Sequence, residues 1–185
     1  MHRTATALFA ATMLAALPAT AADFELTSAD VQPGSSIANT YVFKGFGCSG
    51  DNISPALSWS GAPAGTKSFA ITVYDPDAPT GSGFWHWTVV NIPASVTSLP
   101  RNAGEMGGKN LPAGAVMGRT DFGGAAYGGP CPPAGDKPHR YIFTVFAVKT
   151  DKLDIDGNAA GAIVGFNLHF NTLAKTSFTA TYGRK

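Results

Sequence analysis

Short apolar runs separated by glycine and proline recur along this chain and leave few folds open to it. The 185 residues include 22 Gly, 13 Pro and 12 Phe, a composition that favours many short strands joined by turns over a helical bundle. The runs at 84–92 and 139–148 are apolar on both faces, as expected for central strands of a sandwich that is covered on each side. We therefore predict an all-β protein with minor α-helix, built as an antiparallel β-sandwich.

Weaker patterns complete the predicted fold. The segments 24–31, 40–46 and 56–63 predict edge or half-buried strands, whereas 158–175 has apolar residues near helical spacing and predicts a helix. With 44% hydrophobic and 14% charged residues, the chain suits one globular domain with a substantial core. We find no internal repeat and no linker that would divide this domain.

The first 21 residues have the pattern of a secretory signal peptide. Arg3 precedes an apolar run that ends in small residues, with Ala19 and Ala21 placed as an A-x-A cleavage signal. Cleavage would leave a periplasmic or secreted domain of residues 22–185, in which basic and acidic residues are equal in number. This neutrality argues against a nucleic-acid surface. No other stretch approaches the roughly 18 apolar residues of a membrane span, so stable membrane insertion is not expected.

The chain has two cysteines, Cys48 and Cys131. An even number in an oxidising compartment makes a disulfide the natural interpretation. Two buried free thiols and two metal ligands are the alternatives, although no C-x-x-C spacing supports a zinc site. Sequence spacing does not decide between them.

Polar residues at predicted strand ends are the candidate site. The period of two in 68–75 places Asp75 on the same face as its apolar residues, and His139 and Tyr141 share a face of a later strand. Two histidines and a tyrosine hydroxyl, with a carboxylate that keeps one imidazole protonated, could hold a small anion such as phosphate. In the alternative interpretation, His86 and His139 are structural and the DPDAP segment at 75–79 is a rigid turn.

The segments that carry these residues resemble one known family. DPDAP at 75–79, the histidine of WHWTVVN, GDNISPALSW at 50–59 and GGPCPPAGDKPHRY at 128–141 are similar to the signature of the phosphatidylethanolamine-binding protein family, in its bacterial Raf-kinase-inhibitor-like branch. The resemblance implies a Greek-key β-sandwich with short peripheral helices. It also implies a small pocket at one end for phosphate-bearing head groups or other anions, with no catalysis and no cofactor.

The resemblance also implies roles for individual residues. Asp75, His86, His139 and Tyr141 would line the pocket, and Asp77 and Pro79 would shape its wall. Arg140 would point to the other face of its strand. Cys131 stands where animal members have a glycine that offers its backbone to the ligand, and it lies within a longer Pro-rich loop.

These observations lead to one expected function and two alternatives. We expect an exported, non-catalytic protein that binds a small anionic ligand such as phosphate or a phosphoethanolamine head group. The first alternative is an interaction module whose loops inhibit a partner such as a protease or a signalling component. The second is a metal-dependent hydrolase that would use Asp75, His86 and His139; we expect no bound metal.

Overall fold

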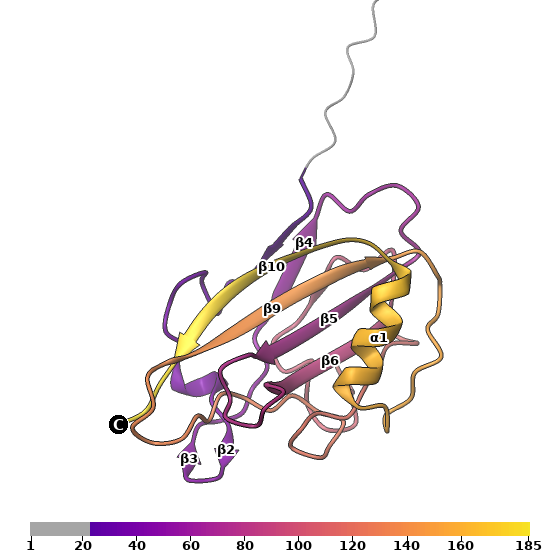
Figure 1. The fold of residues 1–185 in the computed structure, drawn as a ribbon. Coiled ribbons are helices and arrows are strands. Elements are labelled where there is room, and N and C mark those ends of the chain that lie inside the picture. The colour runs from indigo at the N-terminus through magenta and orange to yellow at the C-terminus, as the bar shows by residue number, and fades with distance from the viewer. Residues whose placement is uncertain (1–22) are drawn as a thin grey trace, which may run out of the picture.

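The computed structural model describes residues 23–185, so the predicted signal peptide at 1–21 lies outside the described residues. Two antiparallel sheets pack face to face, and one helix covers the outer face of the larger sheet (Figure 1). The elements are, in chain order, β1 Glu25–Thr27, a 3-10 helix Asn39–Tyr41, β2 Lys44–Gly45, β3 Cys48–Ser49, β4 Leu57–Ser60, β5 Ser68–Asp75, β6 Phe84–Pro93, β7 Ser98–Leu99, β8 Val116–Met117, β9 His139–Val148, α1 Gly161–Asn171 and β10 Thr172–Tyr182.

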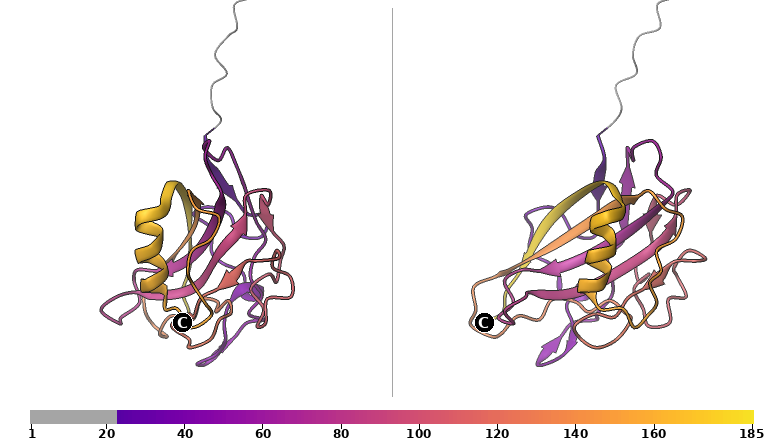
Figure 2. Two further views of the ribbon diagram at one scale, coloured as in Figure 1. Left: turned by 90° about the vertical axis from the view of Figure 1, so that its right-hand side faces the viewer. Right: turned by 45° about the vertical axis from the view of Figure 1, so that its right-hand side comes forward.

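The two sheets differ in size and enclose the main core. The larger sheet has the order β10-β9-β5-β6-β8 and the smaller one the order β1-β4-β7, while β2 and β3 form a separate hairpin. Alternate residues of β5, namely Phe69, Ile71 and Val73, enter the core between the sheets. The residue Ala70 points the other way, into a second apolar cluster with Val164 of α1. The central strands are therefore buried on both faces, as predicted, by a sheet on one side and a helix on the other (Figure 2).

The predicted strand at 40–46 is largely wrong. Residues Asn39–Tyr41 form a 3-10 turn, and only Lys44–Gly45 pairs as a strand. The buried side chains of Tyr41 and Val42 explain the apolar pattern. Their backbone groups form hydrogen bonds with loop residues and not with a neighbouring strand. For example, the carbonyl of Val42 accepts from the amide of Asn52.

The predicted helix at 158–175 is correct in type but too long. It begins at Gly161 and ends at Asn171, and the chain then continues directly as the long strand β10. Thr172 marks the change, because its backbone is extended while its Oγ1 donates to the carbonyl of Leu168. Pairing with β9 over the whole length of β10 outweighs the weak local preference for helix.

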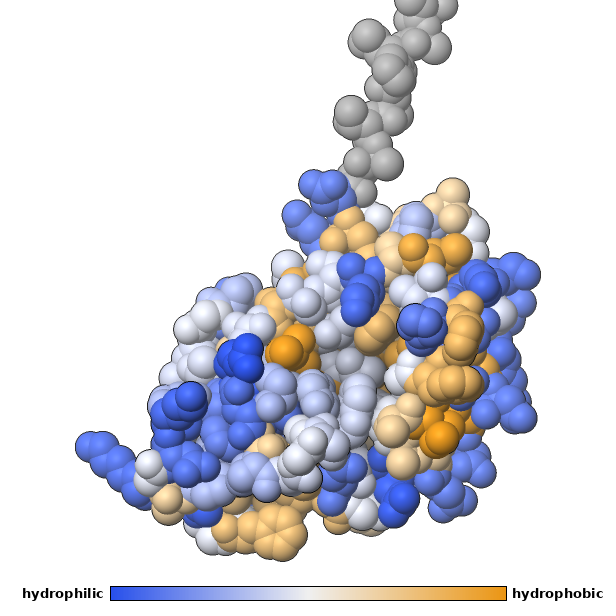
Figure 3. Space-filling model, viewed as in Figure 1, coloured by the Kyte–Doolittle hydropathy of each residue, from blue (hydrophilic) through white to orange (hydrophobic). Residues whose placement is uncertain are grey.

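The outer face of the larger sheet carries an apolar surface where α1 covers it. Apolar residues gather over α1 in the space-filling view (Figure 3), and among the exposed large apolar side chains are Ile163, Phe166 and Phe170 of this helix. In residues 23–185 no helix has the length and apolarity needed to cross a membrane.

Candidate ligand-binding site

A cavity of about 170 Å³ opens at one end of the sandwich, where β5 ends and β6 and β9 begin. Five of the six predicted ligand-binding residues line it. These are Asp75, Pro79, His86, His139 and Tyr141. Residues more than 60 positions apart in sequence thus converge because β5 pairs with both β6 and β9, as predicted from the strand ends.

A β-bulge in β6 directs the side chain of His86 into this cavity. Val73 pairs with Trp87 and Tyr74 pairs with Trp85, so His86 is the extra residue between them. Without the bulge, His86 and Trp87 would point to opposite faces of the sheet. With it, Trp87 packs in the main core while the ring of His86 lies 5.1 Å from that of Tyr141. A bulge beside a candidate site fits the common use of bulges to re-aim a side chain.

The Asp75 carboxylate is buried, and both of its oxygens accept hydrogen bonds. Its side chain is on the core-facing row, as predicted, and the residue is 2% exposed. Oδ1 accepts from the backbone amides of Asp77 at 2.8 Å and Ala78 at 3.1 Å. Oδ2 accepts from Nδ1 of His139 at 2.8 Å. Asp75 therefore both closes the DPDAP turn and orients a histidine, so the two interpretations of this segment are compatible.

His139 is held between two carboxylates. Its Nδ1 faces Asp75, and its Nε2 lies 3.4 Å from Oδ2 of Asp136. Sequence reasoning missed Asp136, although the i,i+3 spacing within the Pro-rich loop could have indicated it. As expected, a carboxylate fixes one of the two imidazoles, and this is the imidazole of His139.

The environment of His86 is different. Its Nδ1 lies 2.7 Å from the carbonyl oxygen of Gly128, so this ring is held by the backbone and not by a carboxylate. Burial lowers the pKa of His86 below its usual value of 6.5, since a charged imidazole loses its hydration there. The neutral ring then donates from Nδ1 to Gly128, and Nε2 is left as an acceptor.

Tyr141 presents a buried hydroxyl without a hydrogen-bond partner among the described residues. The residue has no exposed surface, and it lines the cavity. Burial, the negative charge of Asp75 and the proximity of its carboxylate raise the pKa of Tyr141, so the phenol stays protonated. Because the hydroxyl forms no hydrogen bond of acceptable geometry within residues 23–185, it remains available as a donor.

Asp77 does not line the cavity, but its hydrogen bonds to Arg140 hold the DPDAP turn of the cavity wall against β9. Its carboxylate accepts from Nε and Nη2 of Arg140 at 2.9 and 2.7 Å, and from the backbone amide of the same residue. The hydrogen bonds to Arg140 lower the pKa of Asp77 to about 2. Arg140 itself is exposed, on the opposite face of β9 from His139 and Tyr141, as expected.

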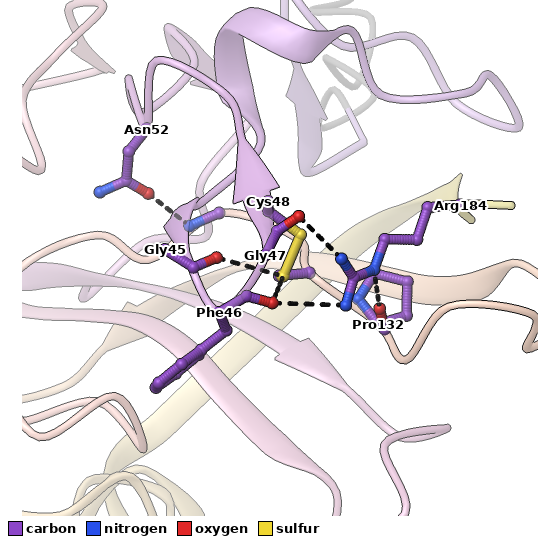
Figure 4. The surroundings of a disulfide bond; sticks show 9 residues. Gly45, Phe46, Gly47, Cys48, Asn52, Pro132 and Arg184 are labelled. Carbon is purple, nitrogen blue, oxygen red and sulfur yellow. Dashed lines mark hydrogen bonds between the residues drawn. A yellow bond between two sulfur atoms is a disulfide. The ribbon is translucent and has the colours of Figure 1, made fainter.

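A disulfide joins Cys48 of β3 to Cys131 of the cavity wall, across 83 residues of sequence (Figure 4). The predicted bridge is therefore present, and the free-thiol and metal-ligand interpretations of this pair are wrong. Arg184 reinforces the connection, because its guanidinium donates to the carbonyls of Pro132 and Gly47 (Figure 4).

An aromatic rim, which sequence reasoning did not identify, surrounds the mouth. It consists of Phe46, Phe84 and Phe122, all of which line the cavity, and their rings lie 4.8–5.9 Å apart in adjacent pairs. Phe46 is 74% exposed and has a φ of 51°, a conformation that is uncommon for a bulky residue. The two-residue turn of the β2–β3 hairpin, Phe46-Gly47, requires positive φ at both positions.

The geometry gives the metal-dependent hydrolase no support. Within residues 23–185, no three His, Cys, Asp or Glu side chains are arranged to hold a metal ion. Nδ1 of each cavity histidine is instead within hydrogen-bond distance of an oxygen of the protein itself.

Comparison with known proteins identifies close relatives over nearly the whole described chain. The sequence profile of the family described as phosphatidylethanolamine-binding protein matches residues 27–183. The UPF0098 protein YbcL of Escherichia coli K12 is 58% identical over 164 residues, which are 89% of this chain and 90% of the relative. YbhB of the same organism is 52% identical and covers 85% of this chain and 99% of its own length.

Solved structures agree with this assignment. The crystal structure of E. coli YbcL, described as a member of the mammalian PEBP family, superposes with a TM-score of 0.87 and covers 89% of this chain and all of its own. A phosphatidylethanolamine-binding protein homolog from Chlamydia trachomatis has a TM-score of 0.72 at 29% identity, covering 88% and 98% of the two chains. The chain described here belongs to the phosphatidylethanolamine-binding protein family.

Proposed function

We propose that this protein is an exported, non-catalytic receptor for small phosphate-bearing anions, such as phosphate or a phosphoethanolamine head group. The observation that carries the proposal is the buried, unpaired hydroxyl of Tyr141 in the cavity. A buried hydroxyl without a partner costs about 1–3 kcal/mol, and a ligand oxygen would remove this cost. Family membership supports the proposal, since the family is named for a phosphate-containing ligand.

The ionisation of the cavity favours a singly protonated phosphate group. Tyr141 offers a donor, while neutral His86 offers an acceptor at Nε2 once its Nδ1 has donated to Gly128. A hydrogen phosphate has both unprotonated oxygens and one O–H group, so it can pair with both residues. A cavity of about 170 Å³ is smaller than the roughly 300–1,000 Å³ of pockets for drug-sized ligands, which favours a head group over acyl chains.

A purely binding role is supported by the state of the cavity's reactive groups. The sulfur of Cys131 is in a disulfide, and the hydrogen bonds of the two histidines go to carboxylate and carbonyl oxygens. Within residues 23–185, neither imidazole is hydrogen-bonded to a hydroxyl or thiol that it could activate as a nucleophile.

Export is supported by the signal-peptide pattern at 1–21 together with the disulfide, because disulfides persist in oxidising compartments. An N-terminus at Ala22 or Asp23 in the processed protein, determined by mass spectrometry, tests this part.

An interaction module remains the second candidate, and Phe46 is the observation in its favour. This side chain is largely exposed on a hairpin that the disulfide holds at the cavity mouth. Exposed aromatic residues on rigid supports are typical anchors of protein interfaces.

Two tyrosine variants test the anion-binding proposal. Tyr141→Phe removes an unpaired hydroxyl, so we expect unchanged or higher stability without ligand and about fivefold or greater loss of phosphate affinity in calorimetry. Tyr127→Phe is the matched control, because its buried hydroxyl donates to the carbonyl of Tyr41 at 2.9 Å. It should lose about 1 kcal/mol of stability and keep its affinity. If Tyr141→Phe instead destabilises the free protein and binds phosphate like the wild type, the proposal is wrong.

A further inference from the structure

A groove of about 470 Å³ runs beside α1 on the outer face of the larger sheet. Its lining takes a residue from each of the four long strands and from the helix, namely Trp85 of β6, Thr72 of β5, Phe146 of β9, Lys175 of β10 and Leu168 of α1. Figure 1 shows how α1 crosses these neighbouring strands. The groove shares no lining residue with the ligand cavity, so it is a separate site.

The groove is largely apolar and contains one formal positive charge. Aromatic and aliphatic side chains supply most of its surface, and one of them, Leu173, is 44% exposed. Among the described residues that line the groove, Lys175 is the only Asp, Glu, Lys or Arg. Sites for small molecules commonly combine an apolar lining with a few polar groups that fix the orientation of the ligand.

The ammonium group of Lys175 lies over the groove and has no carboxylate partner. Its Nζ is 5.9 Å from the centroid of the Phe146 ring. None of the salt bridges within residues 23–185 involves Lys175. A bound anion would therefore form a charge-assisted hydrogen bond there without displacing a carboxylate of the protein.

We propose that this groove binds an amphiphilic carboxylate, such as a medium-chain fatty acid. The carboxylate would pair with Lys175, and the alkyl chain would lie along Phe146 and Leu168 toward Trp85. Three strand spacings, about 14 Å in all, separate β10 from β6, which suits an elongated ligand with its charge at one end. The groove volume is within the roughly 300–1,000 Å³ of small-molecule pockets.

The chemistry of the groove distinguishes this ligand from that of the anion cavity. A single cation matches a monoanionic carboxylate better than a dianionic phosphate. Most of the ligand's affinity would come from removing its alkyl chain from water, and each methylene group that is fully buried contributes about 0.8 kcal/mol, which is about fourfold in affinity.

Calorimetric titration of the processed protein with decanoate tests this proposal. We expect a dissociation constant on the order of 100 μM or tighter. Octanoate, which is shorter by two methylene groups, should bind about fivefold or more weakly. Decanol lacks the negative charge and should bind the wild type more weakly than decanoate.

Two variants separate the head-group contact from the chain contact. Lys175→Met removes the charge, so decanoate affinity should fall about tenfold while decanol affinity stays the same. Lys109→Met is the matched control, because Lys109 is exposed on a loop and does not line the groove. Gly165→Leu should weaken both ligands about tenfold, since a Cβ at this lining position would lie 3.8 Å from the ring of Trp85 and the longer side chain would fill the groove.

Any of four results would overturn the proposal. One is a wild-type protein that does not bind decanoate at about 1 mM, and another is a Lys175→Met variant that binds it like the wild type. The third is unchanged decanoate affinity in Gly165→Leu. The fourth is displacement of decanoate by phosphate, which would assign it to the ligand cavity. Circular dichroism of each variant checks the fold, and phosphate affinity should be the same in all variants.

Discussion

At the residue scale, the two cavity histidines have different partners, since Nδ1 of His139 faces a carboxylate and Nδ1 of His86 faces a backbone carbonyl. His86 is buried beside a carbonyl, and burial lowers its pKa below 6.5. Near pH 6.5, His86 therefore becomes protonated in the unfolded chain, whereas in the folded protein it stays neutral to lower pH. Above pH 6.5 the contribution of His86 to the free energy of unfolding is fully present. It falls as the pH decreases, by at most about 1.4 kcal/mol per pH unit for one proton.

The variant His86→Asn should flatten this dependence. Asn can still donate from Nδ2 to Gly128, but it does not titrate. We expect urea unfolding between pH 7 and pH 5, in buffers without phosphate, to show a smaller loss of stability in the variant than in the wild type. His169→Asn, at an exposed position, is the control and should follow the wild type. Parallel curves for His86→Asn and the wild type would contradict this account.

At the element scale, the position of α1 depends on close contact between a glycine and Trp85. A Cβ on Gly161 would lie 2.2 Å from the indole Cγ of Trp85, whereas a Cβ on Gly165 would lie 3.8 Å from the same ring. We expect Gly161→Ala to cost about 1–3 kcal/mol through overpacking. Gly165→Ala should be neutral or stabilise by up to about 1 kcal/mol, because alanine favours helix over glycine.

Thermal unfolding of the two alanine variants measures this difference. The substitutions are chemically identical and four residues apart on one helix, so each serves as the control for the other. Equal melting temperatures would mean that α1 is not seated on Trp85 as described.

At the scale of the whole molecule, the disulfide joins the β2–β3 hairpin to the cavity wall and closes a loop of 83 residues. In the chain-entropy model a loop of this length contributes about 4.5 kcal/mol. We expect the reduced protein to unfold at lower urea concentration than the oxidised protein by up to this amount. The double variant Cys48→Ala/Cys131→Ala should be insensitive to reductant, and titratable thiols in the unreduced, denatured wild type would disprove the bridge.

Local patterns by themselves determined the central strands and the chemical character of the site. The alternation in 68–75 and the apolar run at 139–148 predicted β5 and β9 to the residue, because the side-chain period of a strand is a property of consecutive residues. The position of Asp75 at the end of a core-facing row followed from the same period. The class of fold and five of the residues that line the cavity, Asp75, Pro79, His86, His139 and Tyr141, also followed from sequence motifs.

Tertiary structure decided what consecutive residues do not encode. Strand β10 forms because β9 supplies its partner along its full length, although its first residues have helical spacing. The bulge at His86, and its hydrogen bond to Gly128, depend on the register between β5 and β6 and on a loop 42 residues away. The same holds for the aromatic rim, where Phe46 and Phe122 meet. Hydrogen bonding and burial depend on which distant segments become neighbours, so the partner of each histidine and the protonation of His86 are set by the fold.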